Sequence, residues 1–423
     1  MSRDIFQMAK CMTQNITKGN EIMDLKQAAL DYHQFPKPGK LSVESSKPCA
    51  TQEDLSLAYT PGVAEPVREI NRDPANAYKY TNKGNLVAVI TDGTAVLGLG
   101  NMGALASKPV MEGKAILFKR FADIDVFDIE ITAPSVEAFI ETVVNIAPTF
   151  GGINLEDIAA PHCFRIEKEL RERLDIPVFH DDQHGTAVIV AAALSNALEI
   201  QGKTLASAKI VFLGAGAAGC SCARLLKLMG ATNITMVDKS GVLNTARSDL
   251  HDNNRHLAVA PSAAKSLADV MPNADVFVGV SAANTLVPEL LLLMAPNPVV
   301  FALANPDPEI QPSLAHSVRD DILMATGRSD FPNQVNNALC FPYLFRGALD
   351  AKAKQITDEM QIAAALALAA LARQPVPVEV LQAYHLTSLS FGKDYIIPKP
   401  FDTRLLKVVS GAVADAARLQ QAK

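Results

Sequence analysis

Two short stretches of the chain place paired carboxylates beside apolar residues. The motif G-G-I-N-L-E-D-I contains Glu156 and Asp157, and the motif I-P-V-F-H-D-D-Q-H-G-T-A contains Asp181 and Asp182. A carboxylate that leaves water without a partner destabilises the fold. A hard divalent cation with oxygen ligands compensates for this, and Mg²⁺ or Mn²⁺ suits such a set. The pattern favours a metal site over solvated loop acids.

A glycine-rich motif follows the acid pairs. The sequence G-A-G-A-A-G at residues 214–219 comes after the apolar run K-I-V-F-L, precedes a helical pattern, and is followed by Asp238 at the end of the next apolar run. Such glycines let backbone N–H groups approach a pyrophosphate at a helix N-terminus. The same pattern occurs earlier in the chain, at Gly98–Gly103; this first glycine motif has no such acid after it, and we expect its glycines to let the backbone pass close to the substrate.

The cofactor itself stays open between NAD and NADP. Asp238 would bind a ribose 2′-hydroxyl and favour NAD, whereas Lys239 and Ser240 directly after it would hold a 2′-phosphate. The cofactor-binding candidates are Gly214, Gly216, Ala217, Ala218, Gly219, Asp238 and Asn305.

Two further residues could transfer protons. Lys114 follows a glycine and precedes an apolar run, which indicates a partly buried amine. Burial and a nearby cation both lower the pKa of a lysine, and a neutral amine can act as a general base. Tyr59 lies in L-A-Y-T-P-G-V-A, and its phenol could act as an acid near a metal or an ammonium group. A solvated lysine and a packing tyrosine are the structural alternatives.

Three asparagines complete the candidate site. Asn305 ends a predicted strand, and Asn336 and Asn337 lie in F-P-N-Q-V-N-N. Ligands bind at the carboxyl ends of the strands in doubly wound sheets. These amides could therefore hold a substrate carboxylate or the nicotinamide amide, with turn formation as the alternative.

Composition limits the class of protein. The chain has 423 residues, a net charge of −6, 49% hydrophobic residues and six cysteines. This charge gives no basic field for nucleic acid or an anionic membrane. The cysteines form no paired framework, and neither a signal peptide nor a membrane span is evident. We expect a cytoplasmic protein with a small-molecule substrate.

The order of apolar runs predicts an α/β fold of two domains. Residues 1–22 are expected to be a disordered extension, residues 23–184 a smaller N-terminal α/β substrate domain, and residues 185–423 a Rossmann-type domain with C-terminal helices. Strands predicted near residues 210, 234, 276, 299 and 322 alternate with helices or long connections, which is typical of a doubly wound parallel sheet.

Taken together, these motifs resemble the malic enzymes of the smaller bacterial type. The resemblance rests on A-Y-T-P-G-V-A, T-D-G-T-A-V-L-G-L-G-N-M-G, P-V-M-E-G-K, F-G-G-I-N-L-E-D-I, F-H-D-D-Q-H-G-T-A, G-A-G-A-A-G, L-A-N-P and N-Q-V-N-N, in that order. It implies oxidative decarboxylation of L-malate to pyruvate and CO₂, with NAD or NADP and with Mg²⁺ or Mn²⁺. We also expect a homodimer or a higher homo-oligomer.

The resemblance also implies residue roles. Lys114 matches the general base and Tyr59 the acid. Glu156, Asp157 and Asp182 match the metal ligands, with Asp181 beside them in the catalytic group. Asn305 matches a substrate or nicotinamide contact, and so do Asn336 and Asn337.

One position departs from the family pattern. The larger, eukaryotic-type malic enzymes have an arginine for a substrate carboxylate where Ala95 stands in this chain. Lys83, Lys119, Arg120 or Arg328 could serve instead, and the sequence does not choose among them. The alternatives to a malic enzyme are a malolactic enzyme, a two-domain amino-acid or shikimate-type dehydrogenase, and a non-catalytic dinucleotide sensor.

Overall fold

The computed structural model describes residues 25–422. The chain divides into two compact units, residues 1–46 and residues 47–423. In the first unit, α2 (Leu25–Gln34) is the helix predicted from residue 23 onward. The expected disordered extension at residues 1–22 lies outside the described residues.

The first sheet of the larger unit has four parallel strands in the order β2-β1-β3-β4. They are β1 (Leu86–Thr91), β2 (Asp125–Glu130), β3 (Gly152–Leu155) and β4 (Val178–His180). All six residues of β1 are buried, as expected for a central strand covered on both faces. We did not predict β3, because glycine and asparagine are depleted in strands; pairing with β1 and β4 overrides that preference.

The second sheet has six strands in the order β10-β9-β8-β5-β6-β7. They are β5 (Lys209–Leu213), β6 (Asn233–Asp238), β7 (Gly241–Val242), β8 (Val276–Gly279), β9 (Val299–Ala302) and β10 (Leu323–Thr326). All pairings are parallel except that of β7, which is antiparallel to β6. The strand order reverses on either side of β5, so the predicted doubly wound fold is confirmed.

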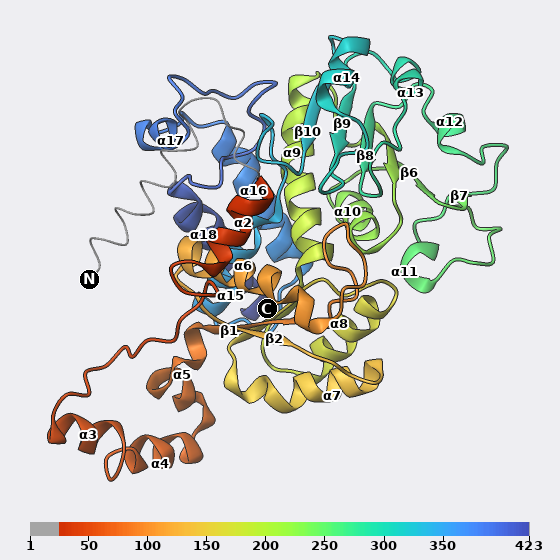
Figure 1. Cartoon of the computed structure of the whole chain (residues 1–423). Coiled ribbons are helices and arrows are strands. Elements are labelled where there is room, and N and C mark those ends of the chain that lie inside the picture. The colour runs from red at the N-terminus through yellow and green to blue at the C-terminus, as the bar shows by residue number, and fades with distance from the viewer. Residues whose placement is uncertain (1–24, 423) are drawn as a thin grey trace. The chain divides into compact units, whose positions relative to one another are not determined.

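The larger unit also forms helices, most but not all of which lie against the two sheets (Figure 1). They are α3 (Gln52–Ala58), α4 (Ala64–Arg72), α5 (Ala77–Tyr80), α6 (Ala104–Ala122), α7 (Val136–Ile146), α8 (His162–Arg173), α9 (Thr186–Ile200), α10 (Ala217–Leu228), α11 (Asp252–Arg255), α12 (Leu267–Val270), α13 (Pro288–Leu292), α14 (Pro312–Val318), α15 (Phe341–Asp350), α16 (Asp358–Ala372), α17 (Val378–Ala383) and α18 (Arg404–Gln421). Five short turns join them, namely η1 (Pro74–Asn76), η2 (Asn82–Asn85), η3 (Ala147–Thr149), η4 (Asp181–Gly185) and η5 (Asn337–Leu339).

The two faces of β1 belong to different cores. Val87 and Val89 pack in a large core that also contains Phe212 of β5, most of α9 and the C-terminal helices. Leu86 and Ile90, which point to the opposite face, pack in a smaller core with α7 and α8. This alternation joins the first sheet to the helices around the second. The predicted boundary at residue 184 falls inside η4 and stays a prediction.

None of the helices within residues 25–422 is long and apolar enough to cross a membrane.

Candidate functional site

The acid pairs meet because their strands are neighbours. Glu156 and Asp157 follow β3, and Asp181 and Asp182 open η4 directly after β4. Since β3 and β4 pair in parallel, their carboxyl ends lie at the same edge of the sheet. One oxygen from each of Glu156, Asp157 and Asp182 lies within 4.8 Å of the others. The structure thus brings the three predicted ligands together.

These carboxylates lie in a buried environment that disfavours their charged form. Glu156 and Asp157 are 2% and 4% exposed. Burial, followed by the charge of Asp182, raises the pKa of Asp157 to about 7, and burial raises the pKa of Glu156 well above its usual value. Asp157 Oδ2 is buried without a hydrogen-bond partner among the described residues. An all-oxygen set with an orphaned carboxylate oxygen fits a hard divalent cation.

Lys114 projects from α6 into this group. Its Nζ lies 2.5 Å from Asp181 Oδ2 and 3.0 Å from Glu156 Oε1, and 4.7 Å from the centroid of the Phe341 ring. The amine is buried, as expected. Its pKa is nevertheless raised, because attraction to Asp181, Glu156 and Asp182 outweighs the lowering effect of burial. The expected lowering of this pKa is therefore wrong for the cation-free chain.

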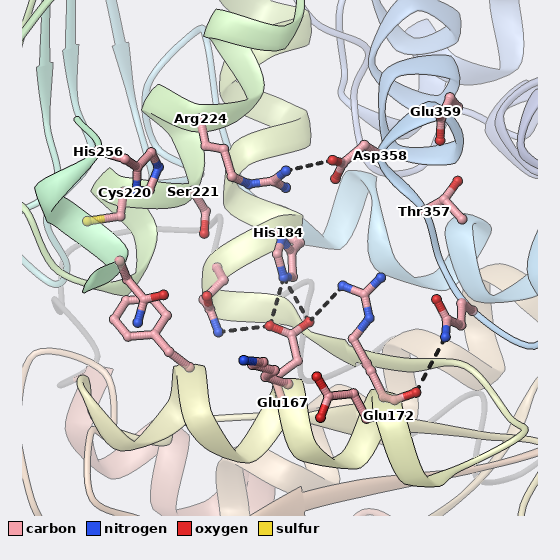
Figure 2. A pocket seen from close by; sticks show the side chains of 16 residues that line it. Glu167, Glu172, His184, Cys220, Ser221, Arg224, His256, Thr357, Asp358 and Glu359 are labelled. Atoms are coloured by element: carbon pink, nitrogen blue, oxygen red, sulfur yellow. Dashed lines mark hydrogen bonds and ion pairs between the residues drawn. The ribbon is translucent and has the colours of Figure 1, made fainter. Parts of the chain in front are cut away.

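Residues behind the cluster anchor η4. Figure 2 shows His184 directed at Glu167 of α8, with His184 Nε2 lying 2.8 Å from Glu167 Oε1. Gln183 Nε2 donates to Glu167 Oε2 at 3.2 Å. A cavity of about 550 Å³ opens beside them, between α8, α10 and the start of α16. On the other strand, the buried Asn154 donates to Glu156 Oε2 at 3.0 Å. These hydrogen bonds hold the carboxylates in position. Sequence reasoning missed the residues that form them, although the polar residues directly after Asp182, in the motif D-D-Q-H-G, could have indicated two of them.

The predicted amides lie at two positions around the cluster. A Cβ placed on Gly185 would lie 3.3 Å from Asn337 Cβ and 1.8 Å from Asp181 Oδ1, so Asn337 is close to the cluster. Asn336 directly precedes η5 as its N-cap, and its Oδ1 accepts from Ala338 N at 2.9 Å. Asn305 follows β9, and a Cβ on Gly98 would lie 2.2 Å from Asn305 O. The first glycine motif therefore makes a close approach to the Asn305 turn.

The second glycine motif joins β5 to α10 at the carboxyl edge of the second sheet. A Cβ on Gly219 would lie 2.0 Å from Gly214 O, whereas a Cβ on Gly216 would meet nothing within 4 Å. Glycine is thus required at position 219 for packing. Gly216, in contrast, leaves open space at the start of the twelve-residue helix α10, whose first turn contains Ala217 and Ala218. This arrangement fits a dinucleotide pyrophosphate. The helix α10 also packs against η4, which carries Asp181 and Asp182.

Asp238 is already partnered. Arg247 donates to both of its oxygens, at 2.9 Å and 2.8 Å, and Ser240 N donates at 2.8 Å. Arg247 also donates to Asp249, at 2.9 Å and 2.6 Å. Sequence reasoning missed Arg247, because it lies nine residues beyond Asp238 in a loop of no recognisable pattern.

Tyr59, the predicted acid, has no described contact with the cluster. It caps the C-terminus of α3, and its side chain is 68% exposed. Neither α3 nor α4 contains a buried residue. Within one chain, the structure gives Tyr59 no described contact with Lys114 or the acids.

Comparison with known proteins identifies the relatives of this chain. Residues 38–135 and 132–171 match the family model described as malic enzyme, N-terminal domain, and residues 183–381 match the one described as malic enzyme, NAD binding domain. An NADP-dependent malic enzyme from Halomonas elongata is 60% identical over 394 residues, with 93% of each chain covered. A bifunctional malic/malolactic enzyme from Bacillus subtilis is 49% identical, also with 93% of each chain covered.

The fold agrees with these matches. The crystal structure of a malic enzyme from Pyrococcus horikoshii Ot3 superposes with a TM-score of 0.85 at 43% identity, covering 94% of this chain and 91% of that chain. Several other curated relatives are longer, and the chain spans about half of their length, or 52%.

Proposed function

The chain belongs to the malic enzyme family, and we propose that it oxidises and decarboxylates L-malate to pyruvate and CO₂ while it reduces NAD(P)⁺. Membership makes it an NAD(P)-dependent oxidoreductase and removes the amino-acid dehydrogenase, shikimate-type dehydrogenase and dinucleotide-sensor alternatives. The observation that supports the reaction most directly is the contact of Lys114 Nζ with Asp181 and Glu156 inside the three-acid ligand set.

Each residue of the cluster has a distinct part in this proposal. Lys114 would accept the proton of the malate C2 hydroxyl, and a bound dinucleotide would supply the hydride acceptor. Asp181 orients the amine through its 2.5 Å contact. Glu156, Asp157 and Asp182 would hold Mg²⁺ or Mn²⁺, which as a Lewis acid stabilises the enolate left after CO₂ departs. The same positive charge would oppose the attraction that keeps Lys114 protonated. Asn337, beside Asp181, and Asn305, at the Gly98 loop, would bind the substrate or the nicotinamide, and Asn336 would position Asn337.

We further propose that the protein is a homodimer or a larger homo-oligomer, and that Tyr59 protonates C3 in the site of a second copy. Leu57 on α3, Tyr59 directly after α3 and Val67 on α4 are each at least 60% exposed. Short helices without buried residues are stabilised poorly by their own propensity, so an apolar face of this kind favours burial against another chain.

Mixing two inactive variants tests this arrangement. Tyr59→Phe and Lys114→Ala, refolded or expressed together, would form mixed oligomers in which one site carries both substitutions and another carries neither. Random pairing would restore roughly a quarter of the wild-type rate. If the mixture stays as inactive as its components, although exchange of subunits is verified by mass, Tyr59 does not act across copies.

The overall reaction is tested by a single assay. Purified protein is given L-malate with NAD⁺ or NADP⁺, with Mn²⁺ or with a chelator, and both pyruvate and reduced dinucleotide are measured. The proposal requires equal amounts of the two products, and only with the metal. Lactate without free reduced dinucleotide would instead support the second candidate, a malolactic reaction, which the name of the Bacillus subtilis relative brings into consideration.

For the cofactor, relatives carry names with either NAD or NADP. We propose a preference for NADP⁺. Both oxygens of Asp238 are occupied by Arg247, so Asp238 is not a free acceptor for a ribose 2′-hydroxyl. Arg247 also donates to Gly241 O at 3.2 Å, so its guanidinium would exchange one of its present contacts for a 2′-phosphate.

A further inference from the structure

The departure at Ala95 leaves the second carboxylate of the substrate without an assigned cation. We propose that Arg328 binds this carboxylate, the one distal to the reacting C2 atom. The inference rests on the proposed malate reaction and adds the residue that selects a dicarboxylate substrate.

The parallel sheet separates the four candidate cations by edge. Lys83 precedes β1, and Lys119 and Arg120 end α6, which leads into β2. All three therefore lie toward the amino edge of the first sheet, roughly 20 Å from the carboxyl edge for a strand of this length. The acid cluster follows β3 and β4 at the carboxyl edge. Lys83, Lys119 and Arg120 therefore lie at the opposite edge of the sheet from the acid cluster.

Two of the three are also engaged elsewhere. Lys83 Nζ donates to Pro148 O at 2.9 Å and to Phe150 O at 2.5 Å. Lys119 Nζ pairs with Asp123 and Asp125, at 2.6 Å and 2.9 Å. Lys108, near the start of α6 at the correct edge, is paired with Asp128 at 2.5 Å and Glu130 at 3.5 Å. Each of these amines is already paired, and none offers two parallel N–H groups to a carboxylate.

Arg328 lies at a carboxyl edge, beside the Asn305 turn. It follows β10 at the carboxyl edge of the second sheet, and its Nη1 donates to Pro306 O at 3.0 Å. The preceding residue, Gly327, packs so closely that a Cβ would lie 2.9 Å from Asn305 Nδ2.

The loop of Ala95 reaches the same turn from the other side. A Cβ on Gly98 would lie 2.2 Å from Asn305 O, and Ala95 N donates to Asp157 O at 2.9 Å. The Asn305 turn thus contacts both the loop that holds Ala95 and the loop that holds Arg328.

The guanidinium is oriented and still has donors to offer. Its Nε and Nη2 donate to the two oxygens of Asp330, at 2.9 Å and 2.8 Å, and its Nη1 lies 3.7 Å from Asp307 Oδ1. These bonds and the one to Pro306 use three of the five N–H groups of an arginine, which leaves one on each terminal nitrogen. Two such N–H groups match the two oxygens of a carboxylate. The side chain is 35% exposed, so a substrate can reach it.

Calorimetric binding with Mn²⁺ and without dinucleotide tests the proposal, because no turnover occurs. The probes are L-malate and its 4-amide, which keeps the shape and loses the distal charge. Arg328→Gln is expected to weaken L-malate binding about 10- to 100-fold and binding of the amide less than about threefold. Arg120→Gln, an exposed cation of the same candidate set, is the matched control and should change neither Kd. Equal weakening of both ligands by Arg328→Gln, or no weakening, would overturn the inference.

Two additional measurements keep the result interpretable. If Arg328→Gln does not fold, Arg328→Lys is used, which keeps the positive charge but lacks the two parallel N–H groups of a guanidinium. It should weaken binding of L-malate more than binding of the amide. Equal effects on the two ligands would again overturn the inference. Wild-type turnover is measured separately. If the wild type binds L-malate yet reduces neither dinucleotide, the proposed reaction fails, whereas normal turnover with an unchanged Kd in Arg328→Gln rejects the assignment of Arg328 alone.

Discussion

At the carboxyl edge of the first sheet, four carboxylates crowd around one ammonium group, and burial raises the pKa of several of them. At the carboxyl edge of the second sheet, the loop from Gly214 to Gly219 carries no charged side chain and is determined by how closely backbone atoms approach. Both edges contribute to one candidate site. At the first edge, interactions between charged groups decide which substitutions are tolerated, whereas at the second edge the space between backbone atoms decides it.

This difference predicts which substitutions matter. At the acid cluster, a change of charge at constant size should have the largest effect, because buried charges interact strongly in a low-dielectric interior. At the glycine loop, a single added methyl group should matter more than any distant charge, because a close-packed backbone cannot adjust. The predictions below separate the two kinds of site.

The largest effect is expected for Lys114→Ala. Loss of the proton acceptor should lower kcat about 10²- to 10⁴-fold. The Kd for dinucleotide should stay unchanged, because the glycine loop does not depend on this amine. Steady-state kinetics and titration of reduced dinucleotide by fluorescence measure the two quantities. Lys108→Ala, on the same helix but 43% exposed, is the control and should retain kcat. A substantial kcat in Lys114→Ala would reject the role of Lys114 as base.

The glycine loop should distinguish packing from ligand space. Gly219→Ala places a methyl group 2.0 Å from Gly214 O and should lower the free energy of unfolding by about 1–3 kcal/mol. Gly216→Ala meets no protein atom within 4 Å and should leave stability unchanged, yet weaken dinucleotide binding about tenfold or more where the pyrophosphate must approach. Thermal unfolding and fluorescence titration of both variants test the pair. Unchanged dinucleotide affinity in Gly216→Ala would show that the open space is not the pyrophosphate site.

The acid cluster should make the stability of the cation-free chain depend on pH. An unfolded aspartate titrates near 3.8, whereas the pKa of Asp157 in the folded chain is about 7. Between these values the folded chain binds more protons than the unfolded one, so its free energy of unfolding falls as pH rises. The raised pKa of Glu156 acts in the same direction. Urea unfolding with a chelator, at about pH 5 and about pH 8, should show this loss, and Mn²⁺ should reverse most of it at the higher pH.

A matched variant links that pH dependence to the cluster. Asp157→Asn removes the titrating group at nearly constant size, so it should flatten the pH dependence with chelator and reduce the stabilisation by Mn²⁺. Equal stability of the wild type at both pH values would reject the raised pKa of Asp157, and equal stabilisation of the Asn variant and the wild type by Mn²⁺ would reject Asp157 as a cation ligand.

The same contrast explains what the sequence could predict. The strand–glycine–helix pattern at residues 214–219 is local, so its role could be read from neighbouring residues, and the structure confirms the fold around it. The acid pairs were found because two carboxylates beside an apolar run are unusual. The strand β3 was missed, since it depends on its neighbours β1 and β4 for pairing.

Electrostatic details were less accessible, because they depend on residues far apart in the chain. Lys114 meets Asp181 across 67 positions, so the net direction of its pKa could not be obtained from its neighbours in sequence. The partner of Asp238 was missed for a related reason. Arg247 lies beyond β7, the short strand that turns the chain back toward β6.

The smallest expected effect concerns this Asp238–Arg247 pair, where two charged side chains follow the uncharged loop of Gly214 to Gly219 and strand β6. Arg247→Gln should weaken binding of 2′,5′-ADP about five- to tenfold, by loss of a charged hydrogen bond to the 2′-phosphate, and should leave binding of 5′-AMP nearly unchanged. The substitution also frees the oxygens of Asp238, so the kcat/KM ratio should shift from NADP⁺ toward NAD⁺. Arg328→Gln is a useful control, because it should not alter either adenosine ligand. If Arg247→Gln weakens both ligands equally, Arg247 only maintains the loop, and the second edge discriminates by space alone.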